Sequence, residues 1–243
     1  MTPHHEHIRT ICKLLRSCTY RYDLHALFSD CMEAAAIAMS NAIDLANRDA
    51  REKRYLDIVG RYERDVVDVF TKVLAEIVLA LEAGPGDVLG VAFAELGLGN
   101  AARGQFFTPY PICQLMAGTL GAADQLAGII EKSEIMRAQD LNNQQQLHVT
   151  AIDIDPRAVH MAYIQFTLMH IPAVVIVGNS LSMEMREHWY TPAHILGGWS
   201  AKLARRDAEE TARQLIDPAP GRDAPVAAPW PDDGTEPRQL RLF

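Results

Sequence analysis

The sequence predicts a mixed α/β protein with a helical N-terminal domain, a small α/β domain and a disordered C-terminal tail. Apolar residues in the first hundred positions recur at the helical period. Two short runs rich in Val and Ile then flank a helical segment between residues 148 and 178. Residues 217–238 hold six of the thirteen prolines and few core-forming side chains. We therefore predict domains at residues 1–103, 104–216 and 217–243.

The composition and net charge exclude some classes of protein and some modes of binding. The chain has 243 residues, 49% of them hydrophobic, which is enough for one large core or two small ones. A net charge of −8 excludes binding of nucleic acid through bulk positive charge, so a DNA contact needs a local patch, a flipped base or a partner protein. No apolar run reaches the roughly 18 residues of a membrane span, and the N-terminus lacks a secretory signal. Four cysteines without CxxC spacing predict reduced thiols in a cytoplasmic protein without a metal site.

Several helices are predicted in the first hundred residues. Residues 23–49 and 54–82 each place apolar side chains close to a period of 3.6 residues. The second pattern stops at the run AGPGD, because Gly84 and Pro85 cannot continue a helix. Asp87 then caps a short helix that ends at the glycines of GLGN.

Residues 104–147 predict a stiff connector, a helix and a polar segment. Pro109 and Pro111 fix two φ angles, so the helix that starts near Ile112 enters at a set angle. The stretch 134–147 then turns polar, and its run LNNQQQL at residues 141–147 indicates a loop or a helix end.

The most regular pattern follows this polar stretch. Residues 148–155, HVTAIDID, predict a strand that ends in acids, and Asp155 with Pro156 forms a helix cap and first turn. The helix over 157–170 is apolar on nearly every face, which predicts that it is buried. Residues 173–178, AVVIVG, are typical of a buried parallel strand. Together these segments predict a right-handed βαβ unit.

The segment from Asp87 to Ala117, which contains the run GQFFTP at residues 104–109, resembles a known family. It is similar to the junction between the helical and catalytic regions of the type I restriction-modification methylation subunit and related adenine-N6 DNA methyltransferases. The resemblance covers roughly residues 85–200 and is strongest to short bacterial members of plasmid or phage type. It implies a reduced Rossmann-like methyltransferase domain and the cofactor S-adenosylmethionine. The run GQFFTP would hold the methionine end of this cofactor, through the residues Gln105, Phe107, Thr108 and Pro109.

Two further positions match the family in the βαβ unit. Asp153, at the end of the first strand, would bind the ribose hydroxyls of the cofactor, since two carboxylate oxygens accept hydrogen bonds from a vicinal diol. Asn179, after the second strand, would read the adenine ring with one donor and one acceptor. Asp155 fits the helix cap better. The alternative for these two acids, taken alone, is a structural role: one caps the helix and the other lies at a solvated strand end.

Two family motifs do not occur in this sequence. One is a strand with a glycine-rich turn before the ribose acid, where the backbone approaches the cofactor. The other is the Asn/Asp-Pro-Pro-aromatic loop that activates the amine of a flipped adenine. We therefore expect a degenerate member that acts on DNA without methylating it alone, and no catalytic residue is assigned. The alternative is a non-catalytic accessory or interference protein for DNA modification, which could pair with a second modification subunit.

The C-terminal pentapeptide carries a separate signal. Its sequence, QLRLF, resembles the short motif by which bacterial polymerases and repair proteins dock on the replication sliding clamp. The resemblance implies that Leu240, Leu242 and Phe243 enter an apolar groove while Gln239 fixes the orientation by hydrogen bonds. We expect modest affinity, because a flexible linker would present only five residues that become ordered on binding. The alternative is a chance apolar chain end.

Overall fold

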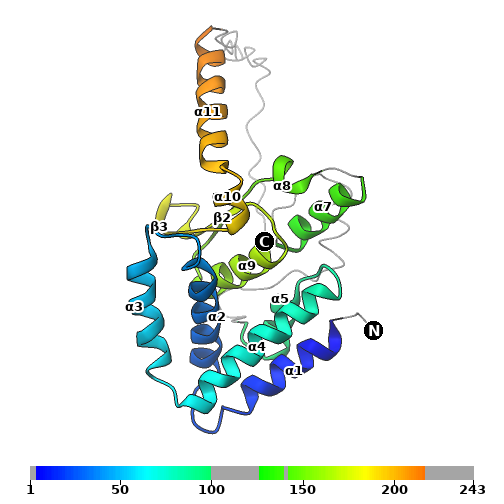
Figure 1. The fold of residues 1–243 in the computed structure, drawn as a ribbon, viewed down its shortest axis with the longest axis vertical. Coiled ribbons are helices and arrows are strands. Elements are labelled where there is room, and N and C mark those ends of the chain that lie inside the picture. The colour runs from blue at the N-terminus through cyan, green and yellow to red at the C-terminus, as the bar shows by residue number, and fades with distance from the viewer. Residues whose placement is uncertain (1–3, 100–125, 140–141, 217–243) are drawn as a thin grey trace, which may run out of the picture. The chain divides into compact units, whose positions relative to one another are not determined.

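The computed structural model describes residues 4–99, 126–139 and 142–216 and shows a mixed helical and sheet architecture (Figure 1). Five helices cover the N-terminal part: α1 (His5–Arg16), α2 (Leu24–Ser40), α3 (Arg48–Val59), α4 (Arg64–Glu82) and α5 (Val88–Glu95). The later elements are α7 (Leu126–Ala138), α8 (Asn143–Gln146), β1 (Val149–Asp153), α9 (Pro156–Leu168), β2 (Ala173–Asn179), β3 (Glu184–Tyr190), α10 (Pro192–Leu196) and α11 (Trp199–Ile216).

The predicted helix signals near residue 87 are confirmed. Asp87 caps α5, because its Oδ1 accepts a hydrogen bond of 2.8 Å from the Gly90 N–H. Just past the end of α5, Gly97 adopts a φ of +71°, which a residue with a Cβ rarely takes. The stop at the run AGPGD is also confirmed, since α4 ends at Glu82.

Two predicted helix boundaries are wrong. The pattern over residues 23–49 breaks at Ser40, where α2 ends, and α3 begins only at Arg48. Leu45 continued the apolar period, but it lies in the intervening turns and is 70% exposed. The pattern over 54–82 also joins two helices, α3 and α4, which are separated by a turn at Gly60. The spacing of apolar residues cannot reveal a turn between two helices when the apolar residues on both sides of the turn stay close to the helical period.

Part of the polar stretch 134–147 is helical, including four residues of the run 141–147 for which a loop or a helix end was predicted. Helix α7 continues to Ala138, and α8 adds a short helical segment at Asn143–Gln146. These described residues therefore contribute no strand to the sheet, and β1 is an outer strand among the strands that the structure describes.

The three described strands form one sheet in the order β1-β2-β3. β1 and β2 are parallel, with Val149 opposite Ala173 and Asp153 opposite Val177, and α9 connects them. The predicted strand–helix–strand unit is confirmed. Asp155 caps α9 as predicted, and both strands start on buried residues. The register sets the carboxyl ends of β1 and β2 at the same edge of the sheet.

The third strand was not predicted. β3 runs antiparallel to β2 and places the buried Trp189 opposite Val175. Two arginines of α3 hold it, since Arg54 Nη1 donates to Glu187 Oε1 at 2.6 Å and Arg51 Nη2 donates to the His188 carbonyl at 2.8 Å. The Glu187 side chain and the His188 carbonyl of β3 thus have partners that lie more than 130 residues away in the chain.

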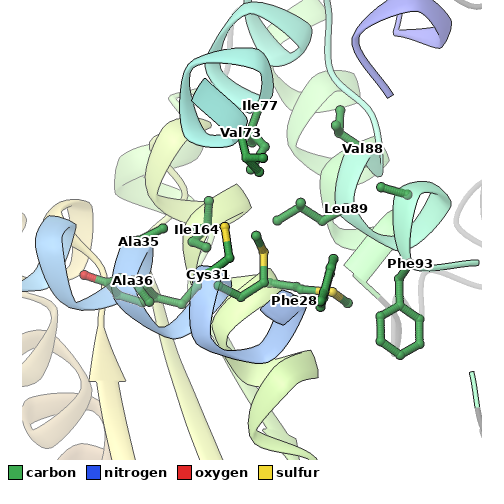
Figure 2. Close-up of a cluster of buried hydrophobic side chains, with 14 of the residues drawn as sticks. Phe28, Cys31, Ala35, Ala36, Val73, Ile77, Val88, Leu89, Phe93 and Ile164 are labelled. Atoms are coloured by element: carbon green, nitrogen blue, oxygen red, sulfur yellow. The ribbon is translucent and has the colours of Figure 1, made fainter. Parts of the chain in front are cut away.

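A continuous apolar core joins the helices to the sheet. Helix α1 packs beside α4, and α2 packs beside α3 and α9 (Figure 1). Figure 2 shows side chains of α2 gathered against side chains of α4, α5 and α9. The labelled members of this cluster are Phe28, Cys31, Ala35, Ala36, Val73, Ile77, Val88, Leu89, Phe93 and Ile164. Each large apolar side chain buried here contributes about 1.5–3 kcal/mol relative to exposure.

Residues 1–200 form one compact unit, and residues 201–243 form a second. In the second unit, the described part of α11 carries an exposed ion pair between Arg205 Nε and Glu209 Oε1 at 2.8 Å. The predicted domain boundary at residues 103–104 and the predicted tail 217–243 lie outside the described residues.

Candidate functional site

The carboxyl end of β1 carries the first candidate residue. Asp153 is the last residue of the strand, and its Oδ1 accepts a hydrogen bond of 2.7 Å from the Asp155 N–H. Partial desolvation and the neighbouring charge of Asp155 raise the pKa of Asp153 above its usual range, although the side chain keeps solvent access. The short turn therefore fixes a solvent-accessible carboxylate at the strand end.

The second acid of this segment has a structural role. Asp155 Oδ1 accepts from the Arg157 N–H at 2.9 Å, which caps α9. The Arg157 guanidinium returns to the same carboxylate, with Nη2 2.7 Å from Oδ2, and lies 5.4 Å from the centroid of the Phe93 ring. This pairing raises the pKa of Arg157. Between the two acids, Asp153 is thus the one available to bind a ligand.

The carboxyl end of β2 carries the second candidate residue. Asn179 Oδ1 accepts from the Leu181 N–H at 3.0 Å and from the Ser182 N–H at 3.4 Å. These bonds close the turn between β2 and β3. The side-chain oxygen is therefore engaged within the turn, and the NH₂ group is the part of Asn179 that can donate to a ligand.

Exposed apolar side chains surround this edge of the sheet. Ile154 follows β1 and is 58% exposed, while Leu181 and Met183 in the β2–β3 turn are 95% and 73% exposed. A carboxylate, an amide donor and exposed apolar groups at one edge suit a ligand that has hydroxyls and an apolar ring, such as a nucleoside.

The structure brings together only part of the predicted cofactor set. Asp153 and Asn179 lie at the ends of neighbouring strands, two register positions apart. The other cofactor residues, Gln105, Phe107, Thr108 and Pro109, lie outside the described residues. The same holds for the docking residues Gln239, Leu240, Leu242 and Phe243.

The structure also contains a buried polar cluster, formed by residues of α3, α9 and β3, that was not predicted from the sequence. Arg51, only 3% exposed, pairs with Asp44 at 2.6 Å and stacks 4.1 Å from the centroid of the Trp189 ring. His160 of α9 meets Trp189 edge-on at 5.0 Å, and neither of its ring nitrogens has a hydrogen-bond partner among the described residues. Burial, with a smaller contribution from nearby arginine charges, lowers the pKa of His160 to about 3. This cluster fastens β3 to α3 and α9.

A second missed group lies at the opposite end of the sheet. His148 directly precedes β1, and its Nε2 lies 2.9 Å from Nδ1 of His194 in α10. No linear motif connects these residues, so the sequence offered no signal beyond the presence of histidines.

The described residues contain no group of three or more His, Cys, Asp or Glu side chains placed to hold a metal ion. None of the helices described here combines the length and the apolarity that a membrane crossing requires. Comparisons with models of protein families, with curated proteins and with solved structures found no match to this chain.

Proposed function

We propose that the chain is a degenerate relative of the S-adenosylmethionine-dependent adenine-N6 DNA methyltransferases, which binds the nucleoside part of the cofactor weakly and acts on DNA without methylating it alone. The observation that carries the proposal is the position of Asp153 at the carboxyl end of a parallel strand, beside a neighbouring strand that ends at Asn179. Ligands of open α/β sheets bind at this edge.

The chemistry of the edge matches a nucleoside. The Asp153 carboxylate can accept hydrogen bonds from both hydroxyls of a ribose, and the NH₂ group of Asn179 can donate to a ring nitrogen. The sequence contains no glycine-rich turn before Asp153 that would bring backbone N–H groups to the methionine end. This combination favours weak binding through the nucleoside and argues against methyl transfer by the chain alone.

Calorimetry of the full chain with S-adenosylmethionine tests the proposal, together with incorporation of a tritiated methyl group into unmethylated DNA. We expect affinity weaker than micromolar and no incorporation. Asp153→Asn should weaken binding further, whereas Glu184→Gln, an exposed carboxylate on β3, should leave it unchanged. Micromolar binding with methyl incorporation would contradict the proposed degeneracy.

A second candidate function is that of a non-catalytic accessory or interference protein for DNA modification, which is recruited by the sliding clamp or completes a second modification subunit. The C-terminal sequence QLRLF after a proline-rich stretch favours it. Pull-down with a bacterial sliding clamp should succeed with the full chain and fail after Leu242→Ala and Phe243→Ala. Retained capture by this double variant would overturn the docking proposal. Cofactor binding separates the two candidates, because only the first requires it.

A further inference from the structure

Three polar side chains form a hydrogen-bonded row at the amino end of the sheet. His194 lies at the centre, with its Nδ1 2.9 Å from His148 Nε2 and its Nε2 2.8 Å from Ser200 Oγ. His194 is only 2% exposed, whereas Ser200 is exposed in the first turn of α11. The row therefore runs from a partly buried histidine, through a buried one, to a hydroxyl in solvent.

One tautomer of His194 allows a proton to move along the row. If His194 carries its proton on Nδ1, it donates to His148 Nε2, and its Nε2 accepts from the Ser200 hydroxyl. Burial lowers the pKa of His194, which favours the neutral ring that a general base requires. This is the order of nucleophile, base and orienting group found in serine hydrolases.

Neighbouring groups hold the row in place. Trp199 Nε1 donates to the Gln144 carbonyl at 3.0 Å, which fastens the start of α11 to α8. The rings of Tyr190 and Trp199 lie 5.1 Å from His194 and 5.0 Å from His148, respectively. Ser200 is the second residue of α11, so its backbone N–H has no acceptor within the helix and can donate to a developing oxyanion.

We propose that Ser200, His194 and His148 form a second site that hydrolyses carboxylic esters. Ser200 Oγ attacks the carbonyl carbon while its proton passes to His194 Nε2. The proton then goes to the departing alkoxide, which leaves as an alcohol. Water hydrolyses the acyl-serine by the same route and releases the acid. Ser200 is the nucleophile, His194 the general base, and His148 a positioning residue that orients His194.

Turnover of p-nitrophenyl acetate and labelling with a fluorophosphonate probe test the site in the full chain. Peptide mapping should locate the label on Ser200. Ser200→Ala should abolish labelling and lower turnover by about 10²-fold or more. Ser17→Ala, an exposed serine on the helical region, should change neither. Failure of the wild-type chain to react with either probe, or unchanged reaction after Ser200→Ala, would overturn the proposal.

A thiol introduced at the nucleophile position tests the role of His194 as the base. In Ser200→Cys, iodoacetamide should modify position 200 at pH values well below the ordinary thiol pKa, because His194 removes the thiol proton. His194→Gln in the same background should move this pH profile upward. An unchanged profile would contradict the role of His194.

The orienting role of His148 predicts rescue by another acceptor. His148→Leu should lower ester turnover, whereas His148→Glu should restore it, because a carboxylate accepts from His194 Nδ1–H and stabilises its protonated form. Equal loss in both variants, with both still folded by circular dichroism, would show that His148 is only structural.

Discussion

The two ends of the small sheet are built in different ways. At the carboxyl end, the bonds of Asp153 and Asn179 reach N–H groups only two or three residues ahead. At the amino end, His148 meets His194 across 46 residues of chain. The ends of strands can be predicted from a local pattern, whereas a long-range cluster exists only after the fold has formed. The positions of Asp153 and Asn179 at strand ends were accordingly predicted from the sequence, whereas the row at the amino end was found in the structure.

The largest expected effect lies between the two ends, at His160. The pKa of its ring is about 3 in the folded state and about 6.5 when unfolded, so the unfolded chain binds more protons between these values. The free energy of unfolding should therefore be highest above pH 6.5. It should fall by roughly 1 kcal/mol per pH unit as the pH drops toward 3. Urea unfolding at several pH values measures this, and His160→Phe should flatten the slope. An equally steep slope in the variant would exclude His160 as the cause.

The next largest effect is expected at Thr191, where a substitution should affect the amino end of the sheet more than the carboxyl end. Thr191 Oγ1 accepts from the buried Ala173 N–H at 2.8 Å and donates to the Ile171 carbonyl at 2.9 Å. Thr191→Val leaves both groups unpaired and should lower the free energy of unfolding by about 3 kcal/mol. It should also reduce ester turnover more than nucleoside binding.

The exposed Thr150 of β1 provides the matched control for this prediction. Thr150→Val should change the free energy of unfolding by less than about 0.5 kcal/mol in urea titration. A similar loss in both variants would show that the buried bonds of Thr191 are not the cause.

A smaller effect is expected in the turn at the carboxyl end. Asn179→Ala removes the acceptor for the Leu181 and Ser182 N–H groups and should cost about 1 kcal/mol. Ser180→Ala, in the same turn, is the control and should be neutral. Thermal unfolding measures both variants, and ester turnover should stay unchanged in both. Reduced turnover after Asn179→Ala would show that the two ends are coupled.

The smallest effect is expected from a glycine placed at each of two positions, one before β2 and one after it. His170, before β2, and Met183, after it, adopt φ values of +56° and +57°. At His170 the Ile171 N–H bonds to the Phe166 carbonyl, which closes a helix-end motif where glycine is preferred. His170→Gly and Met183→Gly should each raise the free energy of unfolding by about 0.5–1 kcal/mol. Destabilisation in chemical denaturation would indicate that side-chain contacts outweigh backbone strain.

The sequence predicted the elements that depend on local signals. The strands over residues 148–178, the caps at Asp87 and Asp155 and the helix between the strands follow from periodicity and short-range hydrogen bonds. It did not predict β3, because this charged strand depends on arginines of α3. Nor did it predict a buried Arg51, since an arginine on a helix normally faces solvent.

The candidate site shows the same division. The position of Asp153 at a strand end follows from the pattern of the βαβ unit. The engagement of the Asn179 oxygen by its own turn does not, because it depends on the conformation of residues 180–183. The hydrogen-bonded row of His148, His194 and Ser200 forms only when separate segments of the chain meet in the folded protein. The spacing of these residues in the sequence therefore does not predict it.

The most direct test of the nucleoside site is an NMR titration of the isotope-labelled chain with millimolar S-adenosylmethionine. Amide shifts should gather at residues 153–155 and 179–182, spare His148 and His194, and disappear in Asp153→Asn. Unchanged spectra, or shifts that persist in Asp153→Asn, would contradict a nucleoside site at this edge of the sheet.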